Sequence, residues 1–438
     1  NSVAGNTVLG ESALDASVSG GNNTAIGKDA LTANTSGASN VAVGAYALDA
    51  NTEGFENVAI GYNALTANTT GWYNVAVGRQ ALLANTTGIS NVAVGLNSMT
   101  DNTTGDNNVA IGKQALGDNT TADNNTAVGH EALKANTTGT NNVALGIQAL
   151  ALNTTADHNT ALGRVCLYDN TTGEKNTAVG SGVLANNTTA SHNTGLGFEA
   201  LTQNTTGADN VAIGYAALDA NTTANWNTAI GARALGANTT GATNTAVGAY
   251  SLDANTTGSQ HTALGYNALT ACTGSENNTG IGYQALEDTT TGIGNTAIGS
   301  RCLRENTTAS NNTGVGLDAL KENTTGTDGV AVGMQALDAN TTGGQNVGIG
   351  KNALGANTTA SFNTGIGHEA LYSNTTGAQV TAVGANALDA NTTGNYSTAV
   401  GRNALGANTT GAGNVGIGLQ ALAANTTASN NTAVGLQA

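Results

Sequence analysis

The sequence is short of most residue types on which ordinary globular folds depend. It has no proline, 3% aromatic residues and 9% charged residues, whereas ordinary globular domains carry about 25% charged residues. The apolar share is 39%, and alanine supplies much of it. One thick core of large side chains is therefore excluded. Any core has to be thin, long and lined by small aliphatic groups.

Positive charge and cysteine are also scarce. The formal net charge is -16, and the 12 Lys and Arg residues are spread singly along the chain. Nucleic acids and anionic membranes are bound by clustered basic residues, so we expect neither as a partner. No apolar run approaches the roughly 20 residues that span a bilayer, so we expect no membrane insertion in this segment. The three cysteines, Cys166, Cys272 and Cys302, lack metal-ligand spacing, and we expect no metal or cofactor.

What the sequence does contain is one short phrase with a fixed period. "NTAIG" at 23–27 returns as "NVAVG" at 40–44 and "NVAIG" at 57–61, always 17 residues later. With the leading Asn as position 0, the unit is N-[T/V]-A-[V/I/L]-G-x-x-A-L-x-A-N-T-T-G-x-x, which ends at position 16. It starts at Asn6 and recurs without insertion to residue 431, giving 26 units that we number as coils. Residues 1–22 are a degenerate first coil or cap, and 23–438 are a continuous array.

The period indicates the fold. Seventeen residues are too few for the helix pairs of most helical repeats, and a glycine in every unit would weaken a helix. The apolar pattern around positions 1 and 3 has the period of two that is typical of a strand. The sequence therefore predicts an all-β fold, a single parallel β-solenoid (β-roll) of about 26 coils with 17 residues per coil. Neighbouring coils should lie about 4.8 Å apart.

The invariant positions suggest how one coil is built. We expect Ile26 at position 3 to point inward and to meet Leu31, at position 8, from the opposite wall. Gly27 at position 4 should form a corner whose backbone conformation is closed to other residues. Asn34 at position 11 should stack on its equivalents in a hydrogen-bonded ladder along the axis. Two large aliphatic groups per coil make a core that only the stacking of many coils can stabilise.

Position 2 is unusual on this interpretation. It should face outward between two inward residues, yet it is Ala or Gly wherever the standard unit holds, where a solvated position would tolerate Lys, Glu or Gln. We therefore predict that another copy of the chain packs against this strip and gives a homo-oligomer, a trimer or a filament. The alternative is that the corner at position 4 crowds position 2 locally. The predicted contact residues are Ala25, Ala42, Ala59, Gly195, Gly280 and Gly348.

The repeated pentapeptide resembles a known family. "NTAIG" and "NVAVG" are similar to the N-[S/T]-[V/T]-A-[I/V]-G repeats in the heads of trimeric autotransporter adhesins. The longer pattern resembles the NTTGxxNTAVGxxAL arrays of bacterial surface proteins and phage tail-fibre-like proteins, over essentially the whole chain. This resemblance implies a left-handed parallel β-roll, usually trimeric, that serves as an extracellular or cell-surface shaft or head for attachment. The adhesin-head unit is shorter than 17 residues, so a filament of another symmetry stays open.

Residues for catalysis do not converge in the register of the repeat. The five histidines lie in separate coils, and His130-Glu131 and His368-Glu369 are adjacent pairs that we interpret as solvated rim residues. No Ser-His-Asp or Cys-His grouping follows from the spacing, and no calcium-roll or phosphate-loop motif is present. We expect a protein that is not an enzyme.

Two kinds of surface site remain as hypotheses. Aromatic residues at positions 15 and 16 could stack on a glycan or a protein receptor; alternatively they pad an oligomer seam or simply vary. Asn-Thr-Thr at position 11 is also a glycosylation sequon, although the ladder explains the pattern without glycans. The candidate ligand contacts are Phe55, Trp72, Tyr73, Trp226 and Tyr396. The candidate glycosylation sites are Asn68, Asn85 and Asn102.

These observations favour a structural or adhesive extracellular fibre or filament subunit that associates with itself. One alternative is a phage tail-fibre shaft. A second is an ice-binding β-solenoid, which presents ranks of Thr on a flat face. Against ice binding, the Thr residues at positions 12 and 13 are adjacent and should point in opposite directions, and Thr at position 1 is interpreted as inward.

Overall fold

A computed structural model describes residues 3–438, and all the regular elements of that range are strands of three residues. The chain divides into two compact units, 1–216 and 217–438. The strands of the first unit are β1 (Thr7–Leu9), β2 (Thr24–Ile26), β3 (Val41–Val43), β4 (Val58–Ile60), β5 (Val75–Val77), β6 (Val92–Val94), β7 (Val109–Ile111), β8 (Thr126–Val128), β9 (Val143–Leu145), β10 (Thr160–Leu162), β11 (Thr177–Val179), β12 (Thr194–Leu196) and β13 (Val211–Ile213).

The second unit repeats the same arrangement. Its strands are β14 (Thr228–Ile230), β15 (Thr245–Val247), β16 (Thr262–Leu264), β17 (Thr279–Ile281), β18 (Thr296–Ile298), β19 (Thr313–Val315), β20 (Val330–Val332), β21 (Val347–Ile349), β22 (Thr364–Ile366), β23 (Thr381–Val383), β24 (Thr398–Val400), β25 (Val415–Ile417) and β26 (Thr432–Val434).

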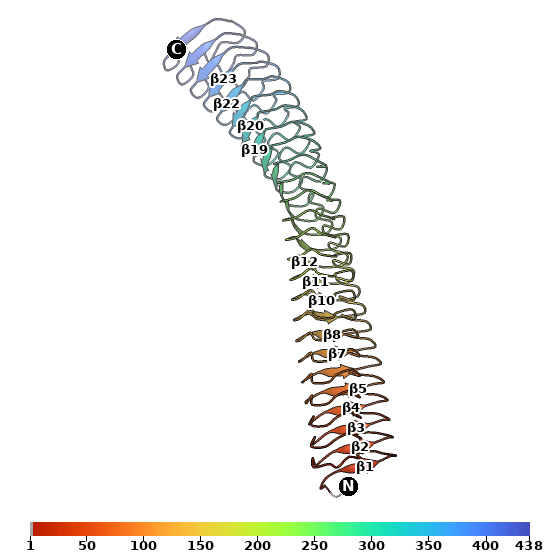
Figure 1. The fold of residues 1–438 in the computed structure, drawn as a ribbon. Coiled ribbons are helices and arrows are strands. Elements are labelled where there is room, and N and C mark those ends of the chain that lie inside the picture. The colour runs from red at the N-terminus through yellow and green to blue at the C-terminus, as the bar shows by residue number, and fades with distance from the viewer. Residues whose placement is uncertain (1–2) are drawn as a thin grey trace. The chain divides into compact units, whose positions relative to one another are not determined.

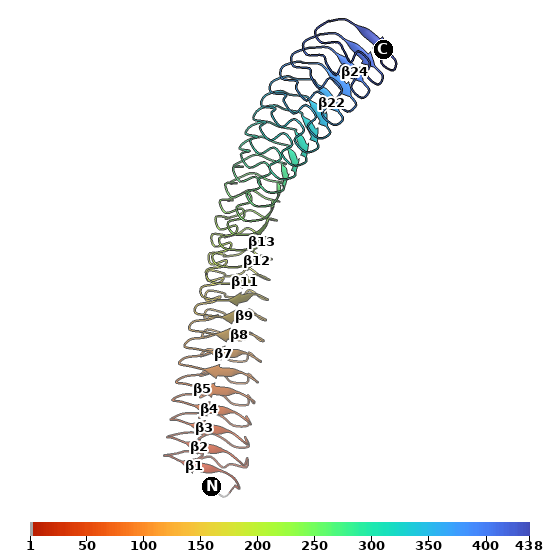
Figure 2. The ribbon, with the colours of Figure 1, turned by 180° about the vertical axis from the view of Figure 1, so that it is seen from behind.

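Within each unit, every strand pairs in parallel with the strand of the next coil. In β3 and β4, Val41 lies opposite Val58 and Val43 opposite Ile60, a register of one 17-residue coil. The degenerate first coil also keeps this register, because β1 pairs with β2. The strands of a unit lie one above another, with turns closing each coil (Figure 1; Figure 2). The predicted parallel β-solenoid with 17 residues per coil is confirmed.

The strands face the other way from the sequence prediction. The alanine at position 2 is fully buried in β2 to β11, whereas positions 1 and 3 lie at the surface, so that Ile60 is 40% exposed and Leu145 46%. The assignment of position 3, including Ile26, to the interior is therefore wrong. A shift of one residue moves every side chain of a strand to the opposite face, and a Val-Ala-Val strand has apolar residues on both faces.

The narrow interior explains why small residues line its strand side. Leu at position 8, such as Leu31, is fully buried and fills the space from the opposite wall. A Cβ atom added at Gly348, on position 2, would lie 3.1 Å from Leu337 Cγ. Where position 7 is enlarged to Val183, the next coil carries Gly195, whose added Cβ would lie 2.4 Å from Val183 Cγ1. The interior thus has room for one methyl group or less at position 2.

The corner after each strand requires glycine. Gly27 has φ of 134°, and its Cβ would lie 2.6 Å from the carbonyl carbon and oxygen of Gly44 in the next coil. Neither that conformation nor that approach is open to a residue with a side chain. The leucine at position 8 has a positive φ in its turn as well, 54° at Leu31. The complete burial of the leucine offsets the strain of about 1 kcal/mol or more in that conformation.

Two ladders of buried asparagines run along the coil axis. At position 11, Asn51 Nδ2 donates to Asn34 Oδ1 of the previous coil at 2.9 Å and to Gly54 O at 3.0 Å. At position 0, Asn40 N donates to Asn23 Oδ1 at 3.0 Å, and Asn40 Nδ2 donates to Gly54 O at 2.9 Å. These bonds satisfy the buried amides and tie each coil to its neighbours.

Candidate functional site

The candidate functional site is the outer face of the strands, which we define by positions 1, 3 and 5. Positions 1 and 3 form two ranks along each unit, and position 5 forms a third rank beyond the glycine corner. Large apolar residues recur and are exposed in the second and third ranks. They include Ile60, Tyr62, Leu96, Ile111, Leu145, Ile147, Leu196, Phe198, Tyr215, Leu264, Tyr266, Tyr283, Ile298, Leu317 and Leu419.

The outer face is long enough to be an interface. Thirteen strands at about 4.8 Å and two outward residues about 7 Å apart make a strip of roughly 430 Å² on each unit. Exposed apolar patches of several hundred square ångströms mark interaction sites in soluble proteins. The first rank differs along the chain: it is Val in all of β3 to β7 and Thr in all of β14 to β19.

The predicted contact strip at position 2 is wrong. Ala25, Ala42 and Ala59 are fully buried, and Gly195, Gly280 and Gly348 occupy the same inward position, facing side chains at positions 7 and 8 of the preceding coil. None of these six residues is accessible to another chain. The residues before and after them in each strand, at positions 1 and 3, face outward. These outward residues form the surface that a partner could contact.

Three of the predicted ligand contacts come together on the edge that precedes the strands. Phe55 and Trp72 stack with ring centroids 5.4 Å apart, and the Tyr73 ring meets them edge-on at 5.6 and 4.7 Å. Trp226 and Tyr396, both largely exposed, lie in other coils and do not join this cluster. The rings of Phe55, Trp72 and Tyr73 therefore all contact one another, in the stacked and edge-on arrangements that aromatic pairs prefer.

The predicted glycosylation sites are not accessible. Asn68, Asn85 and Asn102 are fully buried. Asn85 Nδ2, for example, donates to Asn68 Oδ1 at 2.9 Å and to Gly88 O at 3.0 Å. A glycan on this nitrogen would remove a ladder bond and would have no space inside the coil. Glycosylation at position 11 is therefore incompatible with the folded coil.

The histidine-carboxylate pairs expected at the rim lie at the surface. His130 Nδ1 is 3.9 Å from Glu131 Oε2, and His368 Nδ1 is 3.8 Å from Glu369 Oε2. Across residues 3–438, no three His, Cys, Asp or Glu side chains gather in a way that could hold a metal ion. The same range contains no helix long and apolar enough to cross a membrane.

One Cys-His pair, which the spacing did not predict, lies inside coil 261–277. Cys272 Sγ is 3.4 Å from His261 Nε2 and 2.9 Å from Ser275 Oγ, and all three residues are buried. Burial raises the pKa of the Cys272 thiol and lowers the pKa of His261. Both directions disfavour a thiolate-imidazolium pair. The signal in the sequence was the simultaneous replacement of positions 0, 11 and 14 in one coil.

Shallow polar hollows lie along the turns opposite the strands. One of about 170 Å³ is lined by Asn97, Thr100, Gln114 and the carboxylates of Asp101 and Asp118. Burial, and then the neighbouring Asp101 carboxylate, raise the pKa of Asp118. The negative charge of the neighbouring Asp101 carboxylate disfavours the ionised form of Asp118.

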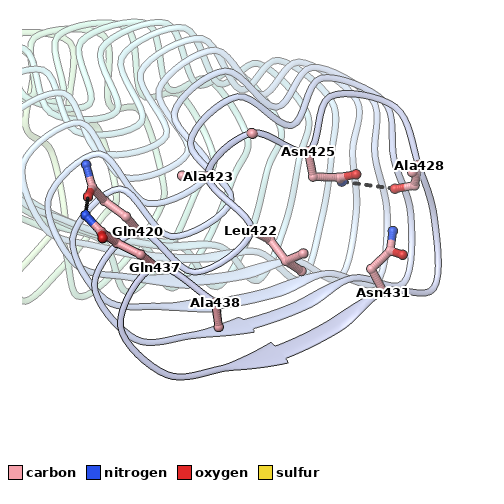
Figure 3. Close-up of a pocket in the computed structure, with 9 residues that line it drawn as sticks. Gln420, Leu422, Ala423, Asn425, Ala428, Asn431, Gln437 and Ala438 are labelled. Carbon is pink, nitrogen blue, oxygen red and sulfur yellow. Dashed lines mark hydrogen bonds between the residues drawn. The ribbon is translucent and has the colours of Figure 1, made fainter.

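Another hollow lies at the end face of coil 414–430 (Figure 3). Leu422, Asn425 and Asn431 line it, and Asn425 Nδ2 donates to Ala428 O at 3.0 Å. These residues occupy positions 8, 11 and 0, which are interior positions in the preceding coils. The hollow therefore exposes the ordinary coil interior and is not evidence of a ligand site.

Comparison with known proteins adds no family to this geometry. No protein-family model matches the chain, and no curated protein matches it in sequence.

Proposed function

We propose that the protein is a non-enzymatic structural subunit of an extracellular or cell-surface fibre, whose chains associate through the outer face of their strands. The observation that supports this proposal is that Val, Ile or Leu at position 3 lies at the surface in every strand, half-buried in some and exposed in others such as Ile111, Leu264 and Ile417. A solvated strand face on an isolated protein is normally polar. Here the acidic residues lie mainly on the turns, and the face beside them carries an unbroken aliphatic rank at position 3 next to Val or Thr at position 1.

The area of the outer face supports the proposal that a second copy of the chain binds there. One chain carries two such strips, one on each unit, of roughly 430 Å² each. Their summed area matches the approximately 800 Å² that each partner buries in a stable protein-protein interface. A partner with the same 17-residue period offers matching ranks along the whole length of each unit. The same periodicity means that no single coil has to bind strongly. An attachment role, as an adhesive fibre or as a phage tail-fibre shaft, is consistent with this architecture and with the exposed aromatic cluster at Phe55, Trp72 and Tyr73.

The oligomeric state in solution tests the proposal. In the face variant, Ile60→Glu, Val94→Glu and Ile111→Glu place three charges on position 3. In the control variant, Thr70→Glu, Thr104→Glu and Thr121→Glu place the same charges at position 13, where Glu53 occurs naturally. We expect sedimentation velocity to show an oligomer for the wild type and the control, and a 42.9 kDa monomer for the face variant. A wild-type protein that stays monomeric at high micromolar concentration would contradict the proposal.

Ice binding is a second candidate, and one observation favours it. Position 1 faces outward, so the Thr residues of β14 to β19 form a rank at the surface with one per coil, about 4.8 Å apart, of which Thr245 and Thr262 are exposed and the others half-buried. The objection that these hydroxyls point inward is thereby removed. The adjoining rank at position 3 is aliphatic. A thermal hysteresis measurement on the purified protein, with ice-crystal shaping as a second readout, decides this candidate, and the absence of both effects excludes it.

A further inference from the structure

The two edges of the outer face carry opposite charge in the first unit. Position 5, which follows each strand, is basic in four of the six coils from 74 to 175 and apolar, Leu96 or Ile147, in the other two. We call this rank the basic edge; its basic members are Arg79, Lys113, His130 and Arg164, all exposed. After Glu11 in the first coil, no Asp or Glu occurs at position 5 anywhere in the sequence.

The opposite edge, at position 15, precedes the next strand and carries acids in the same coils. We call it the acidic edge; its members are Asp106, Asp123, Asp157 and Glu174. No Lys, Arg or His occurs at position 15 in the whole sequence. Asp123 Oδ1 accepts a hydrogen bond from Asp106 N at 2.7 Å, and Asp106 Oδ1 accepts one from Ile89 N at 2.8 Å. These bonds to the previous coil hold the carboxylates in line along the edge.

The two edges do not meet within one chain. They lie at opposite ends of a strand, and Asp106 and Lys113 are separated by seven residues, about 20 Å of extended chain. In the described part of coils 74–175, the ion pairs join Glu131 to His130 and Lys134, and none of them joins the two edges. The complementary charges are therefore available to another molecule.

We infer that chains of this protein associate side by side, pointing in the same direction and in register, so that the basic edge of one chain lies along the acidic edge of the next. This inference rests on the proposed function and specifies its geometry. Lys113 and Asp123 belong to the same coil, as do Arg164 and Glu174. Arg79 and Asp106 lie one coil apart, as do His130 and Asp157. The step between coils is about 4.8 Å, which long basic side chains can reach.

The direction of the chains follows from symmetry. Rotation about an axis parallel to the coil axis, in a dimer or in a trimer, brings different edges of neighbouring chains together. An antiparallel pair brings basic edge against basic edge and acidic edge against acidic edge, which is electrostatically unfavourable. Exposed ion pairs contribute little affinity each. The edges therefore select direction and register, and the aliphatic ranks between them supply the buried area.

Charge variants of the two edges test this geometry. The base-reversed variant carries Arg79→Glu, Lys113→Glu and Arg164→Glu. The acid-neutralised variant carries Asp106→Asn, Asp123→Asn and Glu174→Gln, and its edge hydrogen bonds are kept because Asn395 makes the same bond to Ala378 N at 2.7 Å. The combined variant carries all six changes. All the changed residues lie at the surface, and hydrogen exchange of the monomers checks that the coils still form.

We expect the base-reversed variant to associate at least tenfold more weakly than the wild type at low salt, and less so at high salt because salt screens the repulsion. The combined variant should recover most of that loss, since its acidic edge no longer opposes the new carboxylates. If wild type assembles and the base-reversed variant assembles equally well at low salt, this geometry is overturned while the proposed function stands. If wild type does not assemble at all, both are overturned.

Cross-linking gives an independent readout of direction. Chains carrying Lys113→Cys are mixed with chains carrying Asp123→Cys and oxidised. We expect a disulfide-linked dimer from the mixture and little from either variant alone. Dimers of Lys113→Cys chains alone would indicate the antiparallel arrangement and overturn the inference.

Discussion

Coil 57–73 of the first unit and coil 261–277 of the second unit solve the same hydrogen-bonding problem with different residues. In coil 57–73, Asn57 Oδ1 accepts from Asn74 N at 3.0 Å, and Asn57 Nδ2 donates to Gly71 O at 2.9 Å. In coil 261–277, His261 Nδ1 accepts from Asn278 N at 3.2 Å, and Nε2 lies 2.8 Å from Ser275 O. A neutral imidazole thus provides the one acceptor and one donor that the amide provides elsewhere.

The larger ring has consequences for the neighbouring ladder. A Cβ added at Gly258 would lie 2.8 Å from His261 Nε2, as a Cβ added at Gly54 would lie 2.8 Å from Asn68 Nδ2. His261 Nε2 and Cys272 Sγ are 3.4 Å apart, so a side chain larger than Cys at residue 272 would crowd the ring. Asn255 Oδ1, the acceptor for that missing amide, is buried without a hydrogen-bond partner. The comparison teaches that each ladder site requires a donor and an acceptor in the right place, and that asparagine is one way to supply them.

The largest expected effect comes from breaking the standard ladder. Asn68→Leu removes the donor to Asn51 Oδ1, a bond of 2.8 Å, and leaves that buried oxygen unpaired. We expect coil 57–73 to lose about 3 kcal/mol of local stability, measured as faster hydrogen exchange of its amides. Thr70→Ala at the exposed position 13 is the control, with an expected change within about 0.5 kcal/mol. A loss below about 1 kcal/mol in Asn68→Leu would show that the ladder bonds matter little.

Restoring asparagine alone in coil 261–277 should destabilise it. Cys272→Asn places a larger side chain against His261 Nε2, which already lies 3.4 Å from Cys272 Sγ, and overpacking of this kind costs about 1–3 kcal/mol. Adding His261→Asn and Ser275→Gly should reverse the sign and make the coil more stable than wild type, because Asn255 Oδ1 regains a donor. Hydrogen exchange of the three variants measures this coupling. Stabilisation by Cys272→Asn alone would refute the steric explanation.

Acid should loosen coil 261–277 and spare coil 57–73. Burial holds the pKa of His261 below its ordinary value of 6.5, against weaker raising effects that include the Glu276 carboxylate; the Cys272 thiol beside it is neutral. Because the folded pKa is the lower one, the unfolded coil binds more protons in acid. The stability contribution is therefore full above about pH 6.5 and is lost as the pH falls below that value. Hydrogen exchange at pH 7.5 and pH 5, corrected for intrinsic rates, measures the difference, and His261→Asn should abolish it.

The smallest effect concerns thiol reactivity. Burial raises the pKa of Cys302 to about 12 and that of Cys166 to about 11. The axial bond from Thr273 N to Thr290 O measures 3.4 Å, against 2.9 Å from Thr69 N to Thr86 O in coil 57–73. We therefore expect native protein to react slowly with a thiol reagent, and Cys272 to react before Cys166 and Cys302, as peptide mapping would show. Equal rates at all three thiols would mean that coil 261–277 opens no more readily than the others.

The sequence alone predicted the period, the place of each strand and the parallel register. These features depend on local patterns, a strand of three residues and a corner that only glycine can form, and they recur too often to be missed. It did not predict which side of the strand is inside, because Val41, Ala42 and Val43 are all apolar. A partial signal did exist: Val183 at position 7 is followed by Gly195, and Cys302 by Gly314, which agrees with the contact between positions 7 and 2, although Cys166 is followed by Ala178.

The candidate surface could therefore be anticipated only in part. Self-association through a strand strip was predicted, but the residues of that strip are buried, and the outward residues at positions 1 and 3 take their place as the proposed contacts. At Asn68, Asn85 and Asn102 the sequence left glycosylation open beside the ladder, and the structure contains the ladder. A sequence motif carries no information about whether its side chain faces solvent.

The sequence by itself determined that identical coils stack without interruption. Each unit has the same length, one glycine corner and two asparagine positions, and this leaves no other regular arrangement of hydrogen bonds. What only the tertiary structure decided was the direction of each side chain, because the width of the coil interior is set by the opposing wall. Leucine at position 8 fills that interior, so alanine turns inward to meet it and the larger aliphatic residues remain outside.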